Sequence, residues 1–134
     1  MFIKEIELRI RYAETDRMGY AYYGNYATYF EVARVEAMRA LGMSYKDMED
    51  DGVILPVAEF SIKYKKPAFY DEKITVRVTI KEIPKIRFKF YYETLNEKGE
   101  LLNTAFTELV FVNKQTGRPM VIPNNLKVLF KPYF

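Results

Sequence analysis

Only one stretch of this chain shows the hydrophobic period of an α-helix, and this limits the folds that the chain can adopt. Its apolar residues recur at spacings of four, three, four and four: Tyr26, Phe30, Ala33, Ala37 and Leu41. That spacing predicts an amphipathic helix from about residue 25, which Gly42 is placed to end. The charged residues mostly fall elsewhere around it: Glu31, Arg34, Glu36 and Arg39. A single helix must then cover whatever the other residues form.

Most of the remaining chain alternates between apolar and polar residues, as half-buried β-strands do. The first such strand covers residues 3 to 12, with Ile6, Leu8 and Ile10 on one face. Four more strand-like runs follow, at residues 54 to 66, 72 to 82, 86 to 95 and 101 to 113. Their connections are short enough for antiparallel neighbours. The predicted fold is α+β, a five-stranded antiparallel sheet wrapped around one long helix.

The connecting segments carry turn signals rather than a period. Residues 13 to 25 include two glycines and are expected to form an irregular loop, and residues 44 to 52 a polar connection. Residues 96 to 99 predict a hairpin turn, and the tail a short turn or helix. With 134 residues, 49% of them hydrophobic, the chain suits a single domain over residues 1–134 with one core.

Histidine and cysteine are both absent. Without an imidazole, Ser-His-Asp and Cys-His hydrolysis, histidine-based dehydration and ordinary zinc catalysis are excluded. Without a thiol, disulfides and thiolate metal sites are excluded as well. Acid–base or nucleophilic chemistry therefore falls to Asp, Glu, Lys or Tyr, and we expect neither a metal nor a cofactor.

The net charge and the N-terminal sequence limit the kinds of binding partner that we expect. The formal net charge of +3 is far from the dense basic surface that nucleic-acid binding requires, but it suits a small ligand with a few phosphates. The N-terminus lacks the features of a signal peptide, and no apolar run could span a bilayer, so we expect a cytoplasmic protein without a membrane span. One helix cannot cover so aromatic a sheet. We therefore expect a homo-oligomer, a symmetric dimer that pairs further into a tetramer.

The loop before the helix carries the strongest chemical signal. Asp16 lies in a glycine-containing segment a few residues ahead of the helix N-terminus. Free backbone N–H groups there, at the positive end of the helix dipole, can polarise a carbonyl or hold a developing oxyanion. A carboxylate beside such donors can attack an acyl carbon or activate water. This arrangement suits the hydrolysis of an activated acyl group without histidine.

At these residues the sequence resembles the 4-hydroxybenzoyl-CoA thioesterases of the hotdog superfamily. Their signature, an Asp followed by two residues, a Gly and an Asn-Tyr entering the helix, corresponds here to Asp16-Arg-Met-Gly19 and Asn25-Tyr26. The resemblance covers almost the whole chain, and further matches lie at a strand junction and at the C-terminal end: Pro67-Ala68, Asp71, Gly117-Arg118-Pro119 and Ile122-Pro123. It implies the hotdog fold, an acyl-CoA substrate and hydrolysis to a carboxylic acid and free coenzyme A.

The resemblance also implies roles for individual residues. Asp16 matches the catalytic carboxylate, acting as nucleophile or general base, and Tyr23 matches the residue whose backbone N–H contacts the thioester carbonyl. Many bacterial relatives have histidine at the Tyr23 position. Tyrosine in its place removes a possible imidazole but keeps the backbone N–H donor. Gly19 and Asn25 belong to the signature beside the substrate. The other matches are a segment lining the acyl pocket and basic residues that meet coenzyme A phosphates, in part across subunits: Leu55, Pro56, Val57, Lys85 and Arg118.

Several side chains have more than one reading. Glu59 could orient a water molecule or pair with a lysine, and Glu14 is expected to be solvated. Lys85, Arg87 and Lys89 share one strand face, which is either solvated or contacts phosphate through at least one of the three. The tyrosines of the loop suit a pocket wall or subunit packing equally well: Tyr20, Tyr22 and Tyr23.

Two other functions fit the same motif. A substrate carried on acyl carrier protein would present the same pantetheine arm to the same site. A hotdog subunit that binds acyl-CoA without turning it over would keep the fold and lose the chemistry. Competition between acyl-CoA and acyl carrier protein substrates distinguishes the first alternative from an acyl-CoA thioesterase. Tight binding of acyl-CoA without product release would support the second alternative.

Overall fold

The structure is a computed structural model that describes residues 1–134. Its main sheet has five strands: β1 (Phe2–Arg9), β3 (Val57–Tyr64), β4 (Lys73–Ile80), β5 (Arg87–Leu95) and β6 (Leu101–Val110). Two short strands pair with each other apart from it: β2 (Val53–Ile54) and β7 (Val112–Asn113). The helices are α1 (Tyr26–Leu41), α2 (Tyr45–Asp50) and α3 (Asn124–Lys127). Three 3-10 turns complete the chain: η1 (Tyr12–Glu14), η2 (Tyr23–Asn25) and η3 (Val128–Tyr133).

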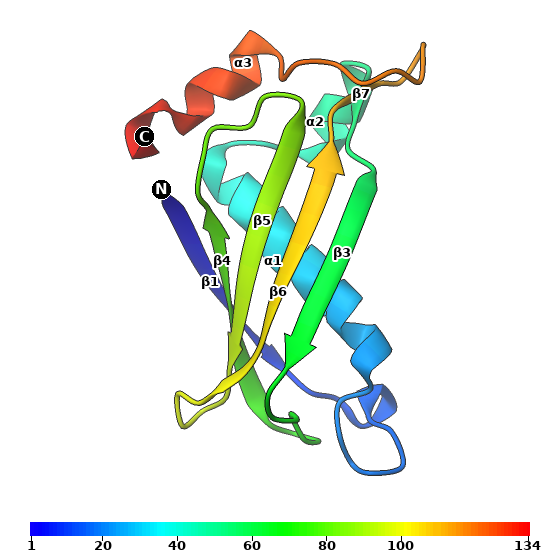
Figure 1. The fold of residues 1–134 in the computed structure, drawn as a ribbon, viewed down its shortest axis with the longest axis vertical. Coiled ribbons are helices and arrows are strands. Elements are labelled where there is room, and N and C mark those ends of the chain that lie inside the picture. The colour runs from blue at the N-terminus through cyan, green and yellow to red at the C-terminus, as the bar shows by residue number, and fades with distance from the viewer.

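The expected five-stranded antiparallel sheet against one long helix is confirmed (Figure 1). The strand order, however, is β1-β4-β5-β6-β3, and every pairing is antiparallel. The expectation that the last four strands are neighbours in chain order is therefore wrong for β3 and β4. The reason is that β4, with both flanks paired, lies between β1 and β5, while β3 forms the edge beyond β6. The segment between them must cross from one side of the sheet to the other.

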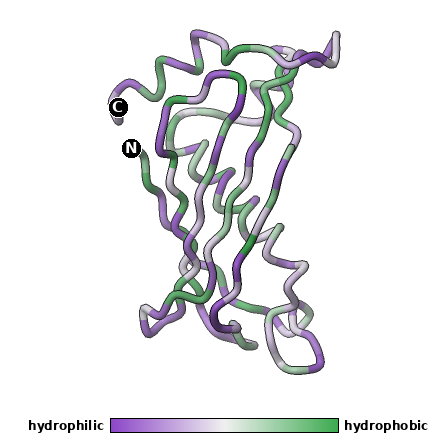
Figure 2. The backbone as a smooth tube through the Cα atoms, viewed as in Figure 1, coloured by the Kyte–Doolittle hydropathy of each residue, from purple (hydrophilic) through white to green (hydrophobic).

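Helix α1 crosses the inner face of the sheet and buries its apolar side (Figure 1). All five residues of the helical period are buried, with Phe30, Ala33 and Ala37 fully so. Hydrophobic and hydrophilic residues alternate along the strands (Figure 2), and burial alternates with them in β4 and β5. Gly42 ends the helix with φ 96°, a left-handed conformation that favours glycine.

Arg34 lies outside the apolar spacing of α1, yet its side chain is not exposed to solvent. It is buried between the helix and the sheet, where its guanidinium donates to the Tyr92 hydroxyl at 3.1 Å and to the Tyr45 hydroxyl at 3.4 Å. The Tyr92 hydroxyl in turn lies 2.6 Å from the Thr107 hydroxyl. Only long-range packing creates these partners, because they come from α2, β5 and β6. Their hydroxyl dipoles compensate part of the cost of removing a charge from water.

Strand β3 is an exposed edge. Seven of its eight residues are exposed, including Val57, Phe60 and Tyr64, although the last two contact rings of α1. An unpaired edge offers free backbone N–H and C=O groups to another strand. Apolar side chains on the same edge point to a surface that is covered in an assembly.

Two smaller elements complete the fold. The polar connection after α1 contains a helix that the sequence reading missed, α2, whose N-cap Ser44 accepts from the Asp47 N–H. The expected short helix of the tail is present as α3. None of the helices reaches the length and apolarity that a bilayer crossing requires.

Candidate active site

The loop between β1 and α1 holds Asp16 in a fixed orientation. One carboxylate oxygen, Oδ1, accepts from the Met18 N–H at 2.8 Å and from the Tyr20 N–H at 3.2 Å. The Asp16 N–H donates to the Tyr20 carbonyl at 2.8 Å, and Gly19, at φ 79°, closes the turn. The second oxygen, Oδ2, has no protein partner. Asp16 therefore presents one positioned and unoccupied carboxylate oxygen.

The start of the helix lies just beyond this loop. Turn η2 continues directly into α1, so the first N–H groups of the combined helix lack partners inside it. The Tyr22 N–H donates to the Glu14 carbonyl, but the N–H groups of Tyr23 and Gly24 have no acceptor in the protein. A Cβ at Gly24 would lie 2.6 Å from the Tyr22 ring, so glycine permits this close packing. Two backbone donors thus remain available at the positive end of the helix dipole.

Asp16 and Tyr23 line the same cavity, of about 390 Å³. This volume lies within the usual range for small-molecule sites, roughly 300–1,000 Å³. The other lining residues come from the loop, from the first turn of α1 and from the end of β3: Met18, Tyr20, Ala21, Tyr26, Tyr64, Lys65, Lys66 and Pro67. The cavity therefore joins one carboxylate, a helix start, several aromatic rings and two lysines.

Two tyrosines of the cavity, Tyr26 and Tyr64, have pKa values above the ordinary tyrosine value. Burial, followed by the neighbouring Tyr64, raises the pKa of Tyr26 to about 12. Burial and then Tyr23 raise the pKa of Tyr64. The rings of Tyr26 and Tyr64 meet edge to face at 5.8 Å. These residues form an apolar wall with hydroxyl edges and supply no base.

The sequence predicted a solvated Glu14, but in the structure this residue is half-buried. Its carboxylate accepts from the Arg11 N–H at 2.9 Å, the Arg11 Nε at 3.1 Å and the Tyr29 hydroxyl at 3.1 Å. Burial raises the pKa of Glu14, but the hydrogen bonds from Arg11 and Tyr29 outweigh it and leave this pKa below its ordinary value. Asn25, a signature residue, donates its side-chain amide to the Glu14 carbonyl at 2.7 Å. Both residues are therefore bonded to protein partners.

The predicted acyl-pocket segment lies at the other end of β3. Leu55 is buried in the core, whereas Pro56 and Val57 are exposed, and none of the three lines the Asp16 cavity. Glu59 is exposed on β3 and has no ion pair within 4.0 Å, so of its two alternatives the pairing with a lysine is not seen. A single chain thus does not bring this segment to Asp16.

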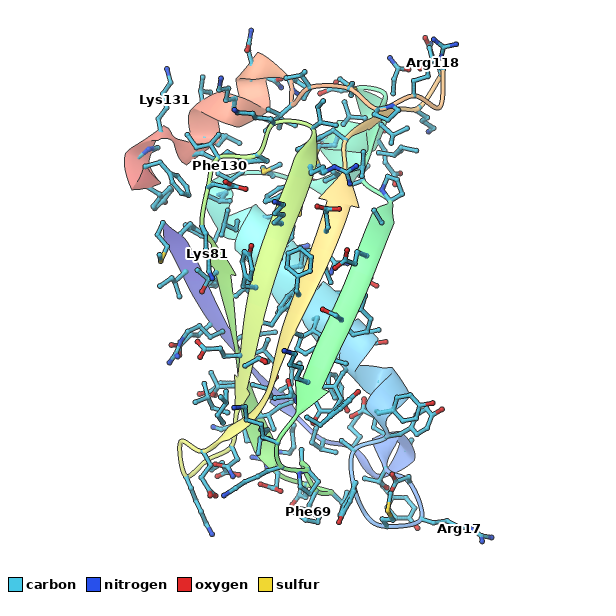
Figure 3. The ribbon with its side chains drawn as sticks, viewed as in Figure 1. Arg17, Phe69, Lys81, Arg118, Phe130 and Lys131 are labelled. Carbon is cyan, nitrogen blue, oxygen red and sulfur yellow. The ribbon has the colours of Figure 1, made fainter.

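The predicted phosphate contacts are also far from the cavity within one chain. Figure 3 shows Arg118 at the end of the molecule opposite Arg17, the neighbour of Asp16. Lys85 is exposed near the tail, since its carbonyl accepts from the Ile122 N–H. Arg87 lies on the same stretch and pairs with Glu108 at 2.7 Å.

Sequence reasoning did not identify the basic residues that do line the cavity, Lys65 and Lys66. Lys66 pairs with Glu100, whereas Lys65 has no ion pair. Tyr64 and Pro67 were missed as lining residues too. The sequence shows two consecutive lysines before a proline, but this pattern does not predict their position. Only the placement of β3 beside α1 brings the two lysines to Asp16. No group of three or more acidic side chains converges to form a metal site.

Comparisons with known proteins show which family the chain is similar to. The family model of the thioesterase-like superfamily matches residues 10–130. A Bacillus subtilis protein named as a putative acyl-CoA thioesterase is 37% identical over 120 residues, covering 90% of this chain and 87% of its own. The crystal structure of a DHNA-CoA thioesterase from Staphylococcus aureus superposes with a TM-score of 0.85 at 42% identity, covering 100% of this chain and 85% of that one.

A third similar structure is that of a protein named as hypothetical. The hypothetical protein TT1821 from Thermus thermophilus superposes with a TM-score of 0.89 at 31% identity, covering 97% of this chain and 98% of that one. The hotdog fold implied by the sequence resemblance is confirmed, because the sheet, the helix and these matches agree. The family model spans nearly the whole chain, including Asp16 and Tyr23. The protein therefore belongs to the thioesterase-like superfamily.

Proposed function

We propose that this protein hydrolyses the thioester bond of an acyl-CoA, releasing a carboxylic acid and free coenzyme A. One observation carries the proposal: Asp16, with one unbonded carboxylate oxygen, lines the same cavity as Tyr23, whose N–H has no acceptor. The similarity to proteins named as acyl-CoA and DHNA-CoA thioesterases supports it. No cofactor is needed, because coenzyme A belongs to the substrate.

The chemistry follows from these two groups. The Tyr23 N–H polarises the thioester carbonyl and stabilises the oxyanion that forms there. As a general base, Asp16 takes a proton from the water molecule whose oxygen bonds to the carbonyl carbon. As a nucleophile, Asp16 bonds to that carbon itself, and water then cleaves the resulting anhydride. In both routes the carbon–sulfur bond breaks and the departing thiolate takes up a proton. Single turnover in ¹⁸O-water tests the choice, because label on Asp16 establishes the nucleophilic route.

The lining of the cavity favours an aromatic acyl group. Tyr20, Tyr23, Tyr26 and Tyr64 surround the space beside Asp16, together with Met18. Aromatic rings pack against each other with a preference of about 0.5–1.5 kcal/mol beyond the area that they bury. The relative named for DHNA-CoA is consistent with this preference. Among acyl-CoA substrates, we expect aromatic ones to give the highest kcat/KM.

We further infer that the working form is a dimer joined through β3. Pairing two copies about a two-fold axis near the middle of β3 sets Val57 of one chain opposite Tyr64 of the other. The segment Leu55–Val57, with Lys85 and Arg118 at the same end of the molecule, then approaches the cavity of the partner. This arrangement reconciles the family's acyl-pocket and phosphate positions with a chain that separates them from Asp16.

The proposal is tested by following thiol release from benzoyl-CoA, a short-chain acyl-CoA, a long-chain acyl-CoA and the matching acyl carrier protein substrates. If wild type turns over the CoA substrates and Asp16→Ala does not, the proposed reaction is established. Turnover of the carrier-protein substrates alone replaces the donor by acyl carrier protein. Tight acyl-CoA binding without thiol release by the folded wild type contradicts the proposed hydrolysis and identifies a binding subunit.

A further inference from the structure

Two residues outside the reacting pair tie the Asp16 loop to the helix start. Glu14 lies two positions before Asp16, and Asn25 is the last residue of η2. The Glu14 carbonyl accepts from the Asn25 side-chain amide at 2.7 Å and from the Tyr22 N–H at 2.8 Å. A single carbonyl oxygen thus joins the beginning of the loop to both sides of the turn that carries Tyr23.

The Glu14 side chain makes the same connection a second time. Its carboxylate receives the Tyr29 hydroxyl from the first turns of α1, and the Arg11 backbone and side chain from the end of the β1 segment. Tyr29 is buried, so this anchor is fixed by the core. Main chain and side chain of one residue therefore hold the loop against two different turns of the helix.

The loop between these contacts is closed on itself. Thr15 and Ala21 form an antiparallel bridge, and the Asp16 N–H bonds to the Tyr20 carbonyl. The Ala21 N–H also donates to the Ala68 carbonyl at 2.7 Å, which attaches the far side of the loop to the connection between β3 and β4. These hydrogen bonds hold the loop together, so its attachment to the helix start bears directly on where Asp16 lies relative to the Tyr23 N–H.

We propose that Glu14 and Asn25 are positioning residues, which clamp the Asp16 loop to the helix start and set the geometry between the carboxylate and the Tyr23 N–H. Neither residue lines the cavity, so neither needs to touch the substrate. The Tyr22 N–H is hydrogen-bonded to the Glu14 carbonyl within the clamp, so the N–H groups of Tyr23 and Gly24 are the first free donors of the helix start. The inference rests on the proposed hydrolysis, in which a displacement of about 1 Å at such a pair costs about 100-fold in rate.

The test compares Asn25→Ala with wild type by steady-state kinetics and by amide hydrogen exchange. The clamp predicts that kcat falls about tenfold or more while KM stays within about threefold, because the cavity lining is untouched. It also predicts faster exchange at the Tyr22 amide, whose acceptor is the clamped carbonyl. Tyr29→Phe, which removes the contact from the helix side, should shift kcat and exchange in the same direction.

The matched control is Asn96→Ala. The Asn96 side chain also ties a loop, accepting from the Lys98 and Glu100 N–H groups, but it lies in the β5–β6 hairpin outside the cavity. A loss of kcat that Asn96→Ala reproduces at equal loss of thermal stability would overturn the clamp, as would unchanged kcat or unchanged Tyr22 exchange in Asn25→Ala. If wild type releases no thiol, the proposed hydrolysis fails and the exchange measurement alone decides on the clamp.

Discussion

At the scale of single residues, the loop separates what a sequence can predict from what it cannot. Asp16 and Tyr23 were predicted as a pair because their signature lies within about ten consecutive residues, and the structure places both in one cavity. The burial of Glu14 was not predictable, since its partner Tyr29 is brought back only by the turn into α1. The same holds for Arg34, whose partners lie on other elements. Polar residues acquire such roles from contacts distant in sequence.

Glu14 gives a prediction for pH. Since its pKa in the folded protein is below the ordinary value of 4.5, its ionised form stabilises the fold at higher pH. That contribution is lost as pH falls through the folded pKa. Glu14→Gln should therefore unfold at lower urea concentration than wild type at pH 7, and the difference should shrink below about pH 4. A difference that is the same at pH 7 and pH 3 would show that the charge of Glu14 contributes nothing.

At the scale of elements, the periods predicted the long helix and all five strands, because each reflects which local face is buried. The order of the strands was not contained in those periods. Only pairing across the sheet decides that β4 lies beside β1 and β3 at the edge. Lys65 and Tyr64 could not be assigned to the cavity for the same reason, since they reach it only when β3 packs beside α1.

The end of α1 gives a prediction of its own. Gly42 has φ 96°, and a Cβ there would meet only Leu129 at ordinary contact distance, 3.6 Å. The cost of Gly42→Ala is therefore that of the left-handed backbone, about 1 kcal/mol of unfolding free energy. Gly42→Asn should lose less, because asparagine tolerates this conformation better. Urea unfolding measures both, and equal losses for the two variants would refute the backbone explanation.

At the scale of the whole molecule, the exposed edge of β3 is the surface that predicts how two copies of the chain associate. Its apolar side chains and free backbone groups suit pairing with a second copy. Ser61 lies beside the middle of the strand, so Ser61→Glu would set two like charges near each other across the two-fold axis. We expect wild type to scatter light as a dimer or a multiple of it, and Ser61→Glu as a monomer with reduced turnover.

The control for this change places the same charge on an internal strand. Thr79 faces outward on β4, between Ile3 and Tyr91, with no carboxylate opposite it. Thr79→Glu should leave the oligomer and its turnover intact. A monomeric wild type, or a Ser61→Glu variant of unchanged mass, would refute pairing through β3.

The most direct measurement of the central claim compares thiol release from an aromatic acyl-CoA by wild type and by Asp16→Asn. The amide keeps the size of the side chain and one oxygen to accept from Met18 and Tyr20, but cannot act as base or as carboxylate nucleophile. With Asp47→Asn as a surface control, the account predicts that kcat falls about 100-fold or more in Asp16→Asn alone. Turnover by Asp16→Asn within a few-fold of wild type would contradict it.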